Sequence, residues 1–223
     1  MKTDKYLLTI YNALDGYFGD LHWWPGETPF EVVVGAILTQ NTSWNNVKVA
    51  VENLKSREFL DPEKLFEIED NILAELIRPS GYYNVKTRRL KAFLRFLHRE
   101  YGGNLEEMFE EDLWILREKL LDVNGIGEET ADSILLYAGN KPIFVVDLYT
   151  RRILQRHNII DGSPDYGEIQ KLFMTNLPAS VRLFNQYHAL LVNTGKHFCR
   201  KTPRCEGCPL ENMESMLLAL ESR

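Results

Sequence analysis

The sequence predicts an all-α protein, and two features of its pattern lead to that prediction. Apolar residues recur at helical spacing along most of the chain, whereas the alternation typical of strands is nearly absent. Proline, glycine and asparagine separate these stretches, where they end one helix or start the next. In chain order, the expected helices cover 6–17, a stretch from 28–29 to 40–42, 44–54, a stretch beginning at 61–62, 71–77, 84–101, 114–121, a stretch beginning near 128, 148–156, 166–176 and 179–194.

Length and composition fit one large domain or two small ones that share a core. The chain has 223 residues, 44% of them hydrophobic, and no stretch is long and apolar enough to span a membrane. The first helix follows Met1 closely, without the pattern of a secretory signal peptide. Three clustered cysteines do not make a disulfide framework and indicate a metal or cluster site. We therefore expect a cytoplasmic, monomeric protein with no membrane association.

Charge is distributed unevenly along the chain. The formal net charge of −6 argues mildly against nucleic-acid binding. However, the segment from Arg78 to Arg99 has seven Lys or Arg and no acid, and the segment from Lys196 to Arg204 adds four more. These two basic segments are compatible with DNA binding despite the acidic total.

One stretch combines a turn that suits anion binding with a carboxylate. Asn124, Gly125 and Gly127 form a tight turn before a helix that begins near Glu128. Glycine allows positive φ and close approach, and the free N–H groups of a helix start bind anions such as phosphates. Asp147 then ends an apolar run and opens another helix, so the pairing indicates chemistry on DNA. The alternative is that Asp147 only caps its helix, as Asp does well.

Together these motifs resemble the helix-hairpin-helix DNA glycosylases of the endonuclease III superfamily, over nearly the whole chain. A single Gly-x-Gly turn would be weak evidence, whereas several motifs in the right order are specific. The matching stretches are Gly35–Thr42, Gly125–Gly127, Thr130–Ala131, Val145–Asp147 and Cys199 with Cys205–Leu210.

The resemblance implies two helical lobes with a DNA-binding cleft between them. One lobe would be a six-helix unit over 20–140, including the helix-hairpin-helix at about 113–138. The other would combine 1–19 with 141–223 and carry both the catalytic Asp147 and the cysteine loop. A carboxylate beside the sugar would stabilise the positive charge that develops as the base leaves, and would orient or deprotonate the attacking water.

Glu129 is a departure from part of this family. Members that also cut the DNA strand carry at this position a lysine whose amine forms a Schiff base with the sugar. Glutamate cannot form one, so the resemblance implies a monofunctional glycosylase. The alternative role for Glu129 is an acid that stabilises the first turn of its helix.

An aromatic set indicates the base pocket. Trp23, Trp24 and Pro25 lie in one loop and Trp44 begins the second helix after it, so at least one indole is expected to face a cleft rather than a core. A flipped base stacks between such rings, and electron-rich indoles favour a cationic, N-alkylated purine. Plain core packing is the alternative. Together with the segment Arg78–Asn84 and with Glu129, which would join the pocket, this set most resembles the 3-methyladenine glycosylase branch.

The DNA contacts follow from the same resemblance. Gln40, at a helix end, matches the residue that in relatives enters the duplex where the base has left, and would otherwise be a polar helix cap. Basic and polar residues would meet phosphates, although a solvated basic helix face is also possible. The expected DNA-binding residues are Gln40, Tyr82, Asn84, Lys86, Arg89, Asn124, Gly125, Gly127 and Lys196.

The cysteine loop has only three of the four cysteines of the related cluster loop. Cys199, Cys205 and Cys208 are present, and the fourth ligand would fall near Glu214. A four-cysteine iron–sulfur cluster is therefore excluded. A cluster with a non-cysteine ligand, a three-iron cluster, zinc and an empty loop stay open, and the prolines in the loop favour a cluster.

The leading hypothesis is a base excision glycosylase for alkylated purines such as 3-methyladenine, acting on double-stranded DNA that contains a damaged base. A second is an endonuclease III-like glycosylase and lyase for oxidised pyrimidines, which Glu129 weakens. A third is a helix-hairpin-helix module that binds DNA without catalysis.

Overall fold

The computed structural model describes residues 2–213, and all regular secondary structure in that range is helical. The prediction of an all-α protein is therefore confirmed for these residues. The chain divides into two compact units: unit 1 comprises Met1–Trp23 with Pro142–Arg223, and unit 2 comprises Trp24–Lys141. None of the described helices is both long and apolar enough to cross a bilayer.

Unit 1 contains four helices in its described part: α1 (Lys2–Phe18), α10 (Leu148–Arg156), α11 (Tyr166–Asn176) and α12 (Val181–His197). Unit 2 contains α2 (Pro29–Leu38), α3 (Trp44–Ser56), α4 (Pro62–Glu67), α5 (Asp70–Leu76), the 3₁₀ turn η1 (Arg78–Ser80), α6 (Tyr83–Tyr101), α7 (Leu105–Glu110), α8 (Leu113–Leu121), α9 (Glu128–Ser133) and the π-helical turn η2 (Ile134–Ala138).

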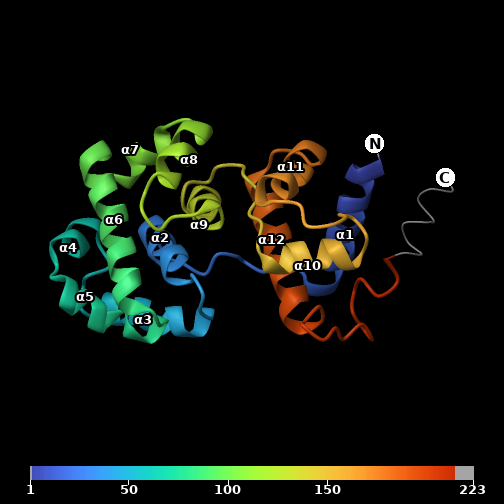
Figure 1. Ribbon diagram of the computed structural model, residues 1–223, viewed down its shortest axis with the longest axis horizontal. Coiled ribbons are helices and arrows are strands. Elements are labelled where there is room, and N and C mark those ends of the chain that lie inside the picture. Colours follow the sequence, from blue (N-terminus) through green and yellow to red (C-terminus); the bar gives the residue numbers. More distant parts are fainter. Residues whose placement is uncertain (1, 214–223) are drawn as a thin grey trace. The chain divides into compact units, whose positions relative to one another are not determined.

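Helix α2 is the centre of unit 2. Thr28 caps its start by accepting a 3.2 Å hydrogen bond from the Glu31 amide, and Pro29 occupies the first turn. Every residue from Phe30 to Leu38 is buried, and the helix packs against α3, α6, α9 and η2 (Figure 1). A helix that is apolar all round must be enclosed by its neighbours. The loop that follows α2 is therefore held on a rigid core.

The structure shifts several predicted helix ends by two to four residues, as at Leu38, where α2 ends before the expected 40–42, and it differs in kind at two places. Helix α7 was not predicted, because Met108 is its single buried residue and it lacks an apolar face; Asn104 caps it by accepting from the amides of Glu106 and Glu107. The helix after the hairpin changes to π-type hydrogen bonding, in which the Gly139 amide donates to the Ile134 carbonyl at 3.0 Å.

Helix α12 organises unit 1 and packs against α1 and α10 (Figure 1). In the core beside it, the rings of Phe144 and Phe173 stack with centroids 3.7 Å apart. The Tyr187 hydroxyl donates a 2.7 Å hydrogen bond to the Leu7 carbonyl on α1. Tyr149 lies directly on Gly195, where a Cβ would come within 2.2 Å of its ring. This close approach sets α12 beside the first turn of α10, which Asp147 precedes.

Candidate active site

The hairpin in unit 2 has the backbone geometry that the sequence predicted. Helices α8 and α9 flank a turn in which Gly125 has φ +89°. A Cβ at Gly125 would lie 2.3 Å from Cγ of Arg89, so this position requires glycine both for its conformation and for close packing. Asn124 and Gly127 are exposed, and Gly127 precedes the first turn of α9. Free amides at that turn are the groups that bind phosphate.

Gln40 connects the loop after α2 to this hairpin. Its Nε2 donates to the Gly125 carbonyl and to Thr130 Oγ1, both at 2.9 Å, and its Oε1 accepts from the Arg89 guanidinium. In this conformation Gln40 and Arg89 support the hairpin from within unit 2. Entry of Gln40 into a duplex would require these hydrogen bonds to break.

The basic segment before and within α6 has exposed and buried members. Tyr82 is 72% exposed in a left-handed conformation, and Asn84 is exposed beside it. Lys86 is only 1% exposed, and its ammonium donates a 2.6 Å hydrogen bond to the Ser80 carbonyl. Burial lowers the pKa of Lys86 to about 8. The structure therefore gives Lys86 an interior place, and the expected phosphate contact would require it to leave that place.

The two neighbouring tryptophans belong to different units. Trp24 packs in unit 2 against Trp44 and Tyr137, with ring centroids 5.1 and 5.2 Å apart. Gly35 makes room for this cluster, since a Cβ there would lie 3.3 Å from Nε1 of Trp24. Trp24 and Trp44 are both partly exposed, and Pro25 is exposed. The cluster therefore presents aromatic surface, as stacking on a base would require.

Trp23 lies in unit 1, where the ammonium of Lys196 is 5.6 Å from its ring centroid. Burial lowers the pKa of Lys196, while the charge of Asp147 raises it. The Lys196 ammonium thus lies over the Trp23 indole and is close enough to Asp147 to feel the charge of its carboxylate. The sequence analysis expected Lys196 to bind DNA as part of a basic segment, and it did not indicate these two neighbours, because neither is near Lys196 in the chain.

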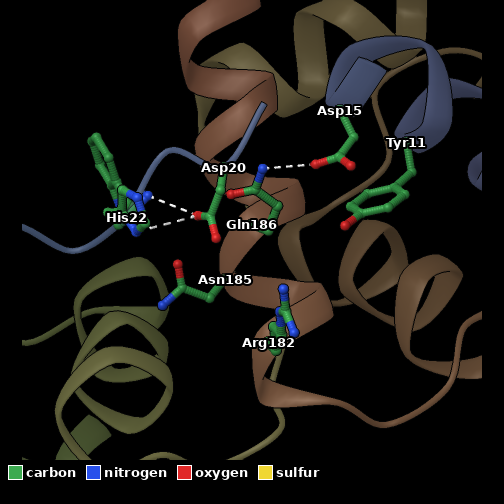
Figure 2. A pocket seen from close by; sticks show the side chains of 8 residues that line it. Tyr11, Asp15, Asp20, His22, Arg182, Asn185 and Gln186 are labelled. Atoms are coloured by element: carbon green, nitrogen blue, oxygen red, sulfur yellow. Dashed lines mark hydrogen bonds and ion pairs between the residues drawn. The ribbon is translucent and has the colours of Figure 1, made fainter. Parts of the chain in front are cut away.

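A polar pocket of about 320 Å³ opens beside Trp23 in unit 1 (Figure 2). Gln186 ties the loop at its rim to α1: its Nε2 donates to Asp15 Oδ1 and to the Gly19 carbonyl, both at 2.8 Å. Its Oε1 accepts from the Leu21 amide at 3.2 Å. Gln186 thus fixes the segment that leads to Trp23. The lining residues are Tyr11, Asp15, Asp20, His22, Trp23, Arg182, Asn185 and Gln186, and all but Trp23 were missed by the sequence analysis.

Asp147 lies at the start of α10 in unit 1. Its Oδ1 accepts a 2.7 Å hydrogen bond from the Thr150 amide, so it does cap the helix. Its Oδ2 lies 3.8 Å from Nε2 of His188 on α12. The Asp147 side chain is 11% exposed, so it is mostly covered but not fully buried. Capping and chemistry are compatible here, because the cap uses one oxygen.

Glu129 and the nearby lysine on the chain lie in unit 2. Glu129 is exposed in the first turn of α9. Lys141 donates to the Glu111 carbonyl at 2.7 Å. Its amine is thus engaged in holding the loop before α8.

The cysteine loop is held by arginines of α10. Arg156 donates to Sγ of Cys199 at 3.2 Å and to the carbonyls of Arg200 and Lys201 at 2.7 and 2.9 Å, and Arg152 donates to the Cys199 carbonyl at 2.7 Å. Cys199 is buried, whereas Cys205 is exposed.

Among residues 2–213, no group of three His, Cys, Asp or Glu is placed to hold a metal ion. Burial raises the pKa of the Cys208 thiol. The sequence analysis favoured a cluster, and the described residues show no assembled set of ligands for one. Glu214, the position considered for a fourth ligand, lies outside the described residues.

Comparison with known proteins shows the family. Residues 34–179 match the HhH-GPD superfamily of base excision DNA repair proteins. A Methanocaldococcus jannaschii protein whose name proposes a DNA repair glycosylase is 48% identical, over 95% of this chain and 97% of its own. Endonuclease III of Sulfolobus acidocaldarius is 28% identical, over 82% of this chain and 80% of its own.

Two solved structures are similar over most of their length. The 3-methyladenine DNA glycosylase of H. pylori, bound to 1,N6-ethenoadenine, has a TM-score of 0.76 and 31% identity, covering 88% of this chain and 98% of that one. An endonuclease III–DNA complex has a TM-score of 0.80 and 20% identity, covering 96% and 98%, which supports the fold alone.

The chain therefore belongs to the HhH-GPD superfamily of base excision DNA repair proteins. Within it, the protein is a DNA N-glycosylase of the endonuclease III-like fold.

Proposed function

We propose that this glycosylase is monofunctional and removes an alkylated purine such as 3-methyladenine from double-stranded DNA. The observation that carries the proposal is the placement of Asp147, whose carboxylate caps α10 with Oδ1 and has Oδ2 outside the cap. The second support is Glu129 at the position where lyase relatives carry an amine. The 31% identity to the H. pylori 3-methyladenine glycosylase favours the same substrate class.

Asp147 acts in this proposal on the sugar. The bond between C1′ and the base nitrogen breaks, the electron pair leaves with the base, and positive charge develops on the sugar ring. The carboxylate stabilises that charge, and the N-terminal end of α10 stabilises the carboxylate in turn. Water then adds at C1′ and gives its proton to the carboxylate, so the products are the free base and an abasic sugar.

The aromatic surface supplies the preference for cationic bases. Electron-rich rings attract a cation, and an alkylated purine is already a good leaving group. Because Lys196 covers Trp23 with a positive charge, a cationic base stacked on Trp23 would meet a like charge. We therefore assign this preference to Trp24 and Trp44. Tyr82, Asn84 and the hairpin turn are assigned to the DNA backbone, since they are exposed.

Strand cleavage is not part of the proposed reaction. It needs an amine at the sugar that forms an imine. Glu129 has no amine, and Lys141 is hydrogen-bonded to the Glu111 carbonyl. The expected product is therefore an intact strand with an abasic site.

A product analysis tests the substrate and the reaction together. Duplexes containing 3-methyladenine, 1,N6-ethenoadenine, an oxidised pyrimidine or uracil are incubated with the protein, with and without borohydride. We expect release of the alkylated purines, strands that break only after alkali, and no trapped protein–DNA adduct. Release of oxidised pyrimidines with strand breaks would favour the endonuclease III-like alternative. An adduct lost in Lys196→Met but kept in Lys141→Met would identify Lys196 as the amine and contradict the monofunctional assignment.

A further inference from the structure

His188 is a buried histidine that no part of the proposed reaction uses. It lies on α12, is 5% exposed, and points its Nε2 at Oδ2 of Asp147 across 3.8 Å. The packing of Tyr149 on Gly195 holds α12 against α10, so this geometry belongs to the core of unit 1 rather than to a mobile surface side chain.

The two oxygens of Asp147 are in different environments. Oδ1 is committed to the Thr150 amide at 2.7 Å, which limits rotation of the carboxyl group about its bond to Cβ. Oδ2 is directed to the imidazole at a distance that is longer than a hydrogen bond but short enough for strong electrostatic interaction. The backbone thus fixes one oxygen of the carboxylate, and His188 borders the other.

The charge on the imidazole affects how strongly the Asp147 carboxylate can attract the positive charge on the sugar. Burial lowers the pKa of His188, Asp147 raises it, and Lys196 lowers it. These are the charged groups acting on it among the described residues: one at the start of α10 and one on α12 itself. At neutral pH the imidazole is therefore uncharged. In acid it becomes an imidazolium facing Oδ2 and offsets the charge of the carboxylate.

We propose that His188 is a positioning residue for Asp147: its imidazole lies against Oδ2 and limits the movement of that oxygen, and in its protonated form it attracts the carboxylate away from the sugar. This rests on the proposed role of Asp147 at the sugar. It predicts an acid limit to base release that belongs to His188.

Single-turnover base release tests this inference. The substrate is a duplex with 7-methylguanine; because its N1 can lose a proton near neutral pH, wild type and variants are compared at each pH, and release without enzyme is subtracted. The wild-type rate constant should fall about 10-fold from about pH 7 to pH 5. His188→Gln keeps a neutral polar group and should fall less than about 3-fold over the same range. His188→Leu should be about 10-fold slower even at neutral pH, with unchanged DNA affinity.

His157 provides the matched control. Burial also lowers its pKa, but it follows the last turn of the same helix, α10, away from Asp147. His157→Gln should therefore keep the wild-type pH profile. A His188→Gln profile identical to wild type would overturn the inference.

A second measurement does not depend on a His188 variant that folds. The pKa of His188 is followed by NMR in the wild type and in Asp147→Asn, where it should fall because the carboxylate raises it. An unchanged pKa would contradict the coupling. Base release by Asp147→Asn separates the two proposals: full activity would end the proposed function itself, whereas inactivity with an unchanged His188→Gln profile would end only the role of His188.

Discussion

The two ends of helix α10 carry charged side chains that are used in different ways. At its start, Asp147 gives one oxygen to the helix and directs the other to His188. At its end, Arg156 uses both terminal nitrogens, for one sulfur and two carbonyls of the cysteine loop. Arg156 thus joins α10 to the cysteine loop through three acceptors, whereas Asp147 uses one oxygen for the cap and has the other outside it. We therefore expect function at the first end and stability at the second.

The largest effect should come from Asp147→Asn. Asparagine also caps helices, so α10 should persist while the charge that stabilises the sugar cation is lost. We expect single-turnover base release to slow by at least about 100-fold, with affinity for lesion DNA within a few-fold.

Asp165 is the matched control for this change. It caps α11 in a reciprocal pair with Glu168, and its Oδ1 accepts from the Glu168 amide at 2.7 Å. Asp165→Asn should leave the rate constant unchanged. Equal rates in wild type and Asp147→Asn would remove the functional distinction between the two ends of α10.

The next effect concerns stability and the other end of the helix. Arg156→Met keeps much of the aliphatic stem but removes the donors to the cysteine loop, leaving its carbonyls without them. We expect the free energy of unfolding in urea to fall by about 2 kcal/mol. Arg95→Met removes an exposed guanidinium from α6 and should change it by less than about 0.5 kcal/mol.

The rate constant of base release by folded Arg156→Met should stay within a few-fold of wild type. A loss as large as that of Asp147→Asn would show that the loop takes part in the reaction. In that case both ends of α10 would contribute to the reaction.

The sequence predicted most of the fold because each main helix has an apolar face and a recognisable start or end. It missed α7, whose single buried residue gives no periodicity, and the π-type turn after Ser133, which depends on packing against Phe109. The tight glycine turn predicted for the hairpin is also confirmed, because Gly125 has a φ of +89°.

The contacts of individual site residues could be predicted less well. Lys86 is one of several basic residues in the sequence, and only the fold shows that its stem turns inward to the Ser80 carbonyl. His188 lies in an apolar stretch of α12, far along the chain from Asp147, so no spacing indicates their approach. Arg156 likewise gave no sign that it would hold the cysteine loop. Such contacts depend on tertiary packing, which a linear pattern does not contain.

The smallest effect should follow removal of the thiols and of metal. Cys205 is exposed and Cys208 is partly exposed; burial raises the pKa of the Cys208 thiol, whose sulfur accepts a hydrogen bond from the Leu210 backbone. If arginines hold this loop, Cys205→Ser with Cys208→Ser should change the free energy of unfolding by less than about 0.5 kcal/mol.

Protein purified without oxygen should contain less than one equivalent of iron, sulfide or zinc, and a chelator should not shift its urea midpoint. Cys199→Ala is the positive control, because it removes a buried sulfur in contact with Arg156 and should cost about 1 kcal/mol. A bound metal whose removal destabilises the wild type by several kcal/mol would show instead that this end of α10 is organised by a cofactor.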